Sequence, residues 1–257
     1  MLVLLSCAKT MSAVSKVKVP LTTSPRFQKE AAEIALQMSQ FSVDELERLL
    51  RVNAKIAVEN YKRYQAFHAE ATPELPALLA YTGIVFKRLN PKDFSAEDFG
   101  YAQEHLRLTS FCYGLLRPLD VIRAYRLEGD VVLPELGNQT LFSYWRLRLT
   151  DTFIEDIRSA GGILCNLASD EMKSLFDWKR VESEVRVVTP EFHVWKNGKL
   201  ATIVVYTKMS RGEMTRFILK NKIGNPEELK GFSWEGFEFD ESLSDERKLV
   251  FINGMGE

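Results

Sequence analysis

Two short apolar segments, residues 2–5 and 163–167, constrain the fold of this chain more than any other feature. Neither shows the alternation of polar and apolar residues that a half-exposed strand would have, so each is predicted to be a strand buried on both faces. A sheet that is buried on both faces needs helices to cover it. The pattern therefore predicts an α/β protein with a central sheet flanked by helices.

The remaining elements alternate along the chain in a way that supports this class. Helices are predicted over residues 26–39, 43–67, 95–105, 140–159 and 210–221. Further strands are predicted over residues 185–195, 200–206, 236–240 and 248–252, and Asn197-Gly198 between the first two is a strong hairpin signal. Because no linker or repeat interrupts the chain, residues 1–257 are expected to form one compact domain with a mixed sheet.

The net charge and the cysteine content limit the classes of function that fit this sequence. A formal charge of −1 means that the molecule as a whole is not a basic nucleic-acid binder. The chain has three cysteines and no CxxC spacing, which favours a reducing compartment over a disulfide framework. It has no apolar run of about 18 residues, so no membrane span is expected. We predict a cytoplasmic protein.

Charge is nevertheless segregated along the sequence. Residues 107–126 hold four arginines and one aspartate, and residues 208–222 hold five cations and one glutamate, giving net charges of +3 and +4. Residues 227–246 hold eight acids and one lysine, a net charge of −7. Two basic segments that face one cleft would attract a phosphate backbone. Solvated helix faces are the simpler explanation for such charge runs.

Polar side chains also follow the predicted strands, where ligands gather in α/β sheets. These pocket candidates are Ser6, Lys9 and Thr10 after the first strand, Asn166, Ser169, Asp170 and Glu171 at the second, and Lys208 and Arg211 after a third. A pocket of this kind would suit a nucleotide-like small molecule, or a flipped or terminal nucleotide of DNA. An enzyme acting on a nucleotide or a nucleic-acid base is therefore one hypothesis.

Two catalytic arrangements within this set have simple structural alternatives. Ser6-x-x-Lys9 has the spacing of a serine–lysine nucleophile pair, although the known version lies on a helix. The carboxylates of Asp170 and Glu171 would act as an acid–base pair. Capping of a helix by Ser169, with both acids in the first turn, explains the same residues without catalysis.

Several ordered blocks of the chain resemble one known family, the bacterial YaaA peroxide-stress proteins. The blocks are SCAKT at 6–10, LRL at 106–108, YGLLRPLD at 113–120, YRLE at 125–128, NLASDE at 166–171, YTKMSRGEMTRFI at 206–218 and GFEFD at 236–240. They span almost the whole sequence in the family's order. The chain departs from the family pattern at three places: Cys7 replaces a proline, Ile84 and Phe86 replace an aspartate and a tyrosine, and Phe111-Cys112 replaces a glycine-containing pair.

The resemblance implies a compact α/β fold with a helix-hairpin-helix-like element and a positive cleft. It also implies binding of duplex or branched DNA, and a role in limiting free iron and DNA damage during hydrogen peroxide stress. DNA binding is therefore favoured over catalysis.

If residues 101–120 form the helix-hairpin-helix, Gly114 is its candidate hairpin glycine. The residues expected to contact DNA are Arg107, Gly114, Arg117, Arg123, Arg126, Lys208, Arg211 and Arg216. A core turn in which Arg117 pairs with Asp120 or Glu128 is the structural alternative.

Other chemistry-bearing residues give weaker signals. The three histidines have no ligand spacing, so no metal or cofactor is predicted. Cys7 lies beside Lys9, which would lower the pKa of its thiol and would suit a redox sensor. The four tryptophans are expected in the core rather than on a base-stacking surface.

Overall fold

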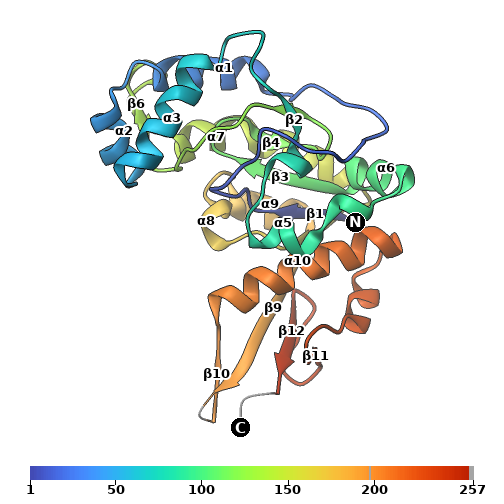
Figure 1. Ribbon diagram of the computed structural model, residues 1–257. Helices are drawn as coiled ribbons and strands as arrows, with labels where there is room; N and C mark the ends of the chain where they lie inside the picture. The colour runs from blue at the N-terminus through green and yellow to red at the C-terminus, as the bar shows by residue number, and fades with distance from the viewer. Residues whose placement is uncertain (197, 255–257) are drawn as a thin grey trace.

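A single mixed sheet organises the molecule, in a computed structural model that describes residues 1–196 and 198–254 (Figure 1). Its strand order is β11-β12-β9-β8-β1-β3-β4, with β10 paired to β9. The strands are β1 (Leu2–Leu5), β3 (Leu106–Ser110), β4 (Gly114–Leu116), β8 (Ile163–Asn166), β9 (Arg186–Lys196), β10 (Lys199–Ala201), β11 (Phe237–Asp240) and β12 (Lys248–Asn253). Two small ladders, β2 (Leu75–Pro76) with β5 (Val121–Ile122) and β6 (Val132–Leu133) with β7 (Gln139–Thr140), lie outside it.

Helices flank this sheet, which confirms the predicted α/β class. The α-helices are α1 (Gln28–Met38), α2 (Val43–Leu50), α3 (Ala54–Ala66), α4 (Ala77–Ala80), α5 (Ile84–Leu89), α6 (Ala96–His105), α7 (Leu141–Ser159), α8 (Asp170–Lys173), α9 (Trp178–Glu184) and α10 (Val204–Asn221). Short 3₁₀ turns cover Pro91–Asp93, Pro134–Leu136 and Pro226–Gly231. That residues 1–257 form one domain stays a prediction.

The first strand lies at the centre of the sheet because it is apolar on both faces. All four residues of β1 are at most 1% exposed. The strand runs parallel to β3 on one side, where Leu5 is opposite Leu108, and parallel to β8 on the other, where Leu4 is opposite Asn166. Parallel pairing on both sides brings the carboxyl ends of three strands to one edge of the sheet.

The prediction of one helix over residues 43–67 was wrong in its length. Ser42 and Glu45 form the predicted capping box, with the amide of Ser42 donating to Glu45 Oε2 at 2.8 Å. The chain then turns at Arg51, which has a left-handed φ of 51°, and Asn53 caps a second helix. A left-handed cap at a residue other than glycine leaves little trace in the sequence.

The predicted helix-hairpin-helix at residues 101–120 is also wrong. Helix α6 ends at His105, and residues 106–116 form the antiparallel strands β3 and β4 instead of a second helix. Gly114 has a φ of +70° and packs beneath the ring of Trp145, where an added Cβ would come within 2.7 Å. Its role in the structure is therefore to let a buried turn pass under an aromatic ring.

The C-terminal strands extend the sheet beyond α10, as Figure 1 shows. Strands β9 and β10 pair in the predicted hairpin, with Lys196 opposite Lys199, although Asn197 lies outside the described residues. The predicted strand over residues 200–206 is wrong in its second half, because β10 ends at Ala201 and α10 begins at Val204. The β-branched and aromatic residues 204–206 favour a strand locally, and the packing of α10 overrides that preference.

Candidate functional site

Two serines from different strand ends meet at the carboxyl edge of the sheet. Ser6 follows β1, and Ser169 precedes α8 after β8. The amide of Ser169 donates to Ser6 Oγ at 2.9 Å, and the two hydroxyl oxygens lie 3.3 Å apart. Ser169 occupies the N-cap position of α8 as predicted, yet its side chain makes no capping hydrogen bond. Its hydroxyl faces Ser6, so simple helix capping does not explain it.

Lys9 is held by a buried carboxylate and not by Ser6. Its Nζ donates to Glu128 Oε2 at 2.8 Å, and Glu128 is only 4% exposed. The other oxygen of Glu128 lies 3.8 Å from the guanidinium of Arg126. Because the ammonium group of Lys9 is engaged in this ion pair, the Ser6–Lys9 spacing does not produce a nucleophile and its base.

Helix α10 supplies two further cations, Lys208 and Arg211. Both were predicted just after a strand, and both lie in the first turns of the helix. The helix approaches α5 closely at Gly212, where an added Cβ would lie 2.3 Å from the carbonyl oxygen of Val85. This close crossing sets α10 against the strand ends and brings Lys208 and Arg211 to the same cavity as Ser6.

Arg211 is the least compensated charge of the group. Its Nε is buried without a hydrogen-bond partner, and among residues 1–196 and 198–254 its guanidinium forms no ion pair. Burial lowers the pKa of Arg211, and the nearby Asp170 offsets this only in part. A half-buried cation whose buried Nε has no hydrogen-bond partner favours the approach of an anion.

These groups line one cavity of about 320 Å³. Its polar wall contains Ser6, Lys9, Thr10, Arg126, Ser169, Glu171, Lys208 and Arg211. Its apolar wall contains Leu5, Ala8, Ile84, Val85, Phe86, Phe111, Leu127, Leu167 and Met172, with Cys7, Gly83 and Tyr125 completing the lining. Seven of the nine predicted pocket residues therefore meet here, and we call this space the strand-end cavity.

Two of the predicted pocket residues do not line it. Asn166 is 1% exposed, and its side-chain oxygen accepts a hydrogen bond from the amide of Ala168. The side chain of Asp170 is 92% exposed and pairs with Lys173 at 2.8 Å. An acid–base pair of Asp170 and Glu171 within the cavity is therefore not formed.

The expectation that Lys9 activates Cys7 was wrong. Burial is the main effect and raises the pKa of Cys7 to about 12, while a hydrogen bond with Thr109 opposes this. Since a thiol with this pKa is almost entirely protonated at neutral pH, Cys7 lacks the thiolate that a redox sensor needs.

All four arginines in residues 107–126 form ion pairs, and the pair of Arg126 with Glu128 at 3.8 Å is the longest of them. Arg107 Nε donates to Asp156 Oδ2 at 2.6 Å, and its terminal nitrogen bonds backbone carbonyls at the end of α6. Arg117 pairs with the buried Asp120 at 2.9 Å, as in the structural alternative. Arg123 pairs with Glu74 at 3.0 Å and donates to the carbonyl of Phe67. Arg126, the remaining arginine, faces the strand-end cavity.

The cations at the far end of α10 are neutralised in the same way. Arg216 forms two hydrogen bonds to Asp93, at 2.8 and 2.6 Å. Lys220 and Lys222 both donate to Asp98, at 2.8 and 2.6 Å. Burial by itself would raise the pKa of Asp98, but hydrogen bonds from the two ammonium groups and from Ser95 outweigh it and hold that pKa well below its usual range.

Asp98→Asn is expected to lower the free energy of unfolding by about 2–3 kcal/mol near neutral pH, because charge-assisted hydrogen bonds are lost. A carboxyl with a depressed pKa in the folded state stabilises fully above its unfolded pKa of about 3.9. Its contribution is lost as pH falls through the folded value. The difference in unfolding free energy between wild type and Asp98→Asn should therefore shrink in urea titrations below about pH 4.

The control is Asp93→Asn, because the side chain of Asp93 in its pair with Arg216 is 51% exposed. This variant should lose no more than about 1 kcal/mol of stability. Equal losses in both variants would contradict the stabilising role given to Asp98.

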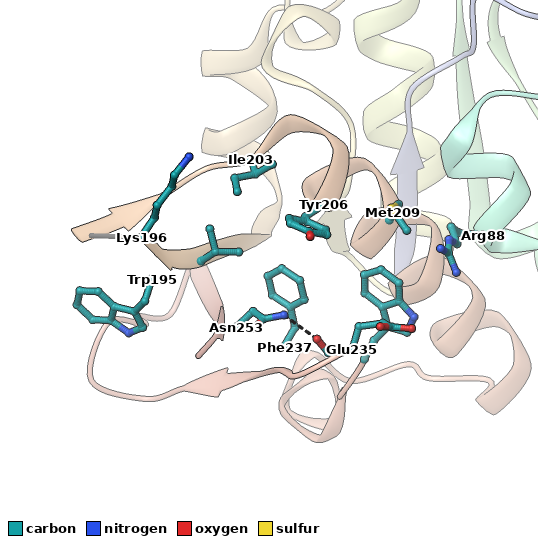
Figure 2. A pocket seen from close by; sticks show the side chains of 11 residues that line it. Arg88, Trp195, Lys196, Ile203, Tyr206, Met209, Glu235, Phe237 and Asn253 are labelled. Carbon is teal, nitrogen blue, oxygen red and sulfur yellow. Dashed lines mark hydrogen bonds between the residues drawn. The ribbon is translucent and has the colours of Figure 1, made fainter. Parts of the chain in front are cut away.

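A second hollow of about 350 Å³ lies on the other side of α10 (Figure 2). Tyr206 and Met209 of α10 line it, and Arg88 of α5 places its guanidinium 5.2 Å from the ring centre of Trp234. Trp195, expected in the core, is 40% exposed at its rim, whereas Trp145 is fully buried as predicted. The alternation of apolar and polar residues along β9 predicted a strand with one exposed face, but it did not predict the hollow beside that face.

Residues 1–196 and 198–254 contain neither a metal-binding cluster nor a membrane-spanning helix. No group of three or more His, Cys, Asp or Glu side chains in these residues is placed to hold a metal ion. None of the helices in this part of the chain is long and apolar enough to cross a membrane.

A mixed sheet whose parallel strands end at a cavity lined by four cations defines an α/β protein with a candidate strand-end site. The family model described as "Peroxide stress protein YaaA" matches residues 1–243. This chain therefore belongs to the YaaA peroxide stress protein family, and the resemblance noted in the sequence is confirmed.

Its relatives extend across distant bacteria. A "UPF0246 protein" of Bacteroides thetaiotaomicron is 99% identical over 257 residues, covering 100% of both chains. A "UPF0246 protein" of Porphyromonas gingivalis is 52% identical over 254 residues, covering 98% of this chain and 99% of the relative. A "UPF0246 protein" of Crocosphaera subtropica is 38% identical over 253 residues, covering 98% of this chain and 100% of the relative.

Proposed function

We propose that this peroxide stress protein binds DNA and that the phosphate backbone contacts the cations around the strand-end cavity. DNA binding of this kind would serve the protective role that the resemblance implies, limiting DNA damage and free iron during hydrogen peroxide stress. Free iron measured in peroxide-treated cells with and without the gene tests the cellular part of the proposal.

The observation that carries the proposal is the difference between paired and unpaired cations. Arg107, Arg117 and Arg216 are committed to carboxylates of the protein. In contrast, Lys208 is exposed and has no ion pair with any residue that the structure describes, and Arg211 beside it lacks one as well. Cations without internal partners are the ones that can release counterions when phosphate binds.

The proposal narrows the predicted interface from two basic segments to one site. DNA contacts from the paired arginines stay a prediction. Each of these arginines would have to exchange its carboxylate partner in the protein for a phosphate of the DNA. Such an exchange gains little, because the carboxylate would lose its own partner. Arg126 also pairs with a carboxylate, that of Glu128 at 3.8 Å, but it lines the cavity and its Nε has no hydrogen-bond partner among the described residues.

Lys208→Ala is expected to weaken DNA binding about tenfold and to lower the slope of log affinity against log salt by about 1, the effect of one lost phosphate contact. Fluorescence anisotropy with duplex, single-stranded and four-way-junction DNA measures both quantities. For wild type with two to four phosphate contacts, affinity should fall roughly 10–150-fold between about 50 and 200 mM salt.

The matched control for this experiment is Lys62→Ala. Lys62 is an exposed lysine on α3, well away from α10 (Figure 1), and its loss changes the net charge equally. Equal losses of affinity in the two variants would mean that binding depends on the net charge of the protein and not on the position of Lys208. Wild-type binding that does not respond to salt would reject the proposal.

An enzyme acting on a nucleotide or a nucleic-acid base is the second candidate. It is favoured by one observation, that Ser6 and Glu171 line the same partly apolar cavity as the cations. Incubation with nucleotides and oligonucleotides followed by mass spectrometry would detect turnover, and Glu171→Gln should abolish it if the carboxylate acts as acid or base. Intact substrates after prolonged incubation with wild type would reject this candidate.

A further inference from the structure

The strand-end cavity has an excess of positive charge that the described protein does not neutralise. Its four cations, Lys9, Arg126, Lys208 and Arg211, are set against the carboxylates of Glu128 and Glu171, which leaves a net charge of +2. Asp170 also acts on Arg211, but it is paired with Lys173 at the surface. The charge balance therefore matches a ligand with two negative charges.

Both arginines of the cavity are incompletely hydrogen-bonded. Arg126 Nε and Arg211 Nε are buried and have no partner in the described residues. Buried donors of this kind are rare, because leaving one unsatisfied costs about 1–3 kcal/mol. Guanidinium groups bind phosphate oxygens through two parallel N–H bonds, and two half-buried arginines with unsatisfied Nε groups supply this chemistry in one cavity.

The size and walls of the cavity restrict the rest of the ligand. Its volume of about 320 Å³ lies at the lower end of the range for small-molecule sites, roughly 300–1,000 Å³. Apolar side chains from β1, α5 and the segment after β8, such as Leu5, Phe86 and Leu167, line the cavity together with the cations. This combination suits one sugar and base beside a phosphate.

We infer that the strand-end cavity binds the terminal phosphate monoester of a nucleotide, with Arg126 and Arg211 holding the phosphate. A monoester carries about −1.5 to −2 charges at neutral pH, whereas an internal phosphodiester carries one. The ligand is the phosphorylated end of a DNA strand or a free nucleoside monophosphate, which share this chemistry. The inference rests on the proposed DNA binding for the first of these sources.

Thermal unfolding with dTMP, and with thymidine as the control, tests the monoester itself. Wild type is expected to gain about 2–4 °C in Tm with saturating dTMP and nothing with thymidine. Arg211→Met keeps the volume of the side chain without its charge. It should abolish the dTMP shift without lowering the Tm of the ligand-free protein, because Arg211 forms no ion pair with the described residues.

DNA ends are tested by anisotropy with three otherwise identical duplexes. These carry a 5′-phosphate, a 3′-phosphate or only hydroxyl ends, and closed circular duplex serves as a competitor. Wild type should prefer one phosphorylated end about tenfold, and Arg126→Met and Arg211→Met should each remove that preference. Arg146→Met, at an exposed arginine of α7 whose Nε donates to the carbonyl of Ser174, should retain it.

The outcomes separate this inference from the proposed function. Equal binding of all three duplexes and of circular DNA, with no dTMP shift, would overturn the inference and leave DNA binding intact. A dTMP shift without any DNA binding would support the monoester site, assign it to free nucleotides and reject the proposed function. Variants with wild-type end preference would overturn the assignment of the two arginines.

Discussion

Asp156→Ala is expected to lower the free energy of unfolding by about 3–5 kcal/mol, the usual loss when one partner of a buried ion pair is removed. Asp156 accepts a hydrogen bond from Arg107, a residue only 7% exposed at the junction of α6 and β3. Without the carboxylate, the guanidinium stays buried with only backbone carbonyls as partners. Urea denaturation at neutral pH measures the loss.

The same helix provides the control for this prediction. Asp151 of α7 pairs with Arg180, and its side chain is 71% exposed. Asp151→Ala should therefore change stability by no more than about 1 kcal/mol. If Asp156→Ala were equally mild, the Arg107 pair would be dispensable for the fold, and Arg107 would again be free to act as a DNA contact.

Gly114→Ala is expected to cost about 2–5 kcal/mol from two separate sources. An L-residue with left-handed backbone angles loses roughly 1–2 kcal/mol. Overpacking of the Cβ against Trp145 adds about 1–3 kcal/mol, since the ring is fully buried and cannot move aside. Chemical denaturation followed by tryptophan fluorescence reports both stability and the environment of that ring.

Gly198→Ala separates the cost of the left-handed backbone from the cost of overpacking. Gly198 has the same φ of +70°, but an added Cβ would meet no atom within 4 Å, so only the backbone cost should appear. The folded Gly114→Ala protein should bind DNA with wild-type affinity, because Gly114 lies in a core turn. A selective loss of DNA binding in Gly114→Ala, with little loss of stability, would restore the hairpin role that the sequence predicted.

The local features of the fold were predictable because their causes are local. The apolar character of β1 and β8, the capping box at Ser42 and the hairpin at residues 196–199 all depend on a few neighbouring residues. The family resemblance, however, suggested a helix-hairpin-helix where the chain forms β3 and β4. Those strands are set by pairing of β3 with β1, about a hundred residues away, which no local pattern records.

The candidate site was likewise predictable where its causes are local and unpredictable where they depend on long-range contacts. Ser6 and Ser169 could be placed together because parallel strands end at one edge of the sheet. The partners of the cations could not be predicted, since Lys9 meets Glu128 and Arg107 meets Asp156 only through the tertiary fold. Charge counting along the sequence therefore identified the basic segments but not which of their cations stay unpaired.

The position of β1 at the centre of the sheet has a consequence for synthesis of the protein. Both partners of β1 are encoded late, β3 at Leu106–Ser110 and β8 at Ile163–Asn166. At translation rates of about 5–20 residues per second, the first strand waits roughly 8–30 s before β8 has been made. During that interval the apolar tetrapeptide of β1 is part of the nascent chain without its β8 partner. Assembly of the central sheet must therefore follow most of translation, and the growing polypeptide is open to chaperone capture or aggregation until then.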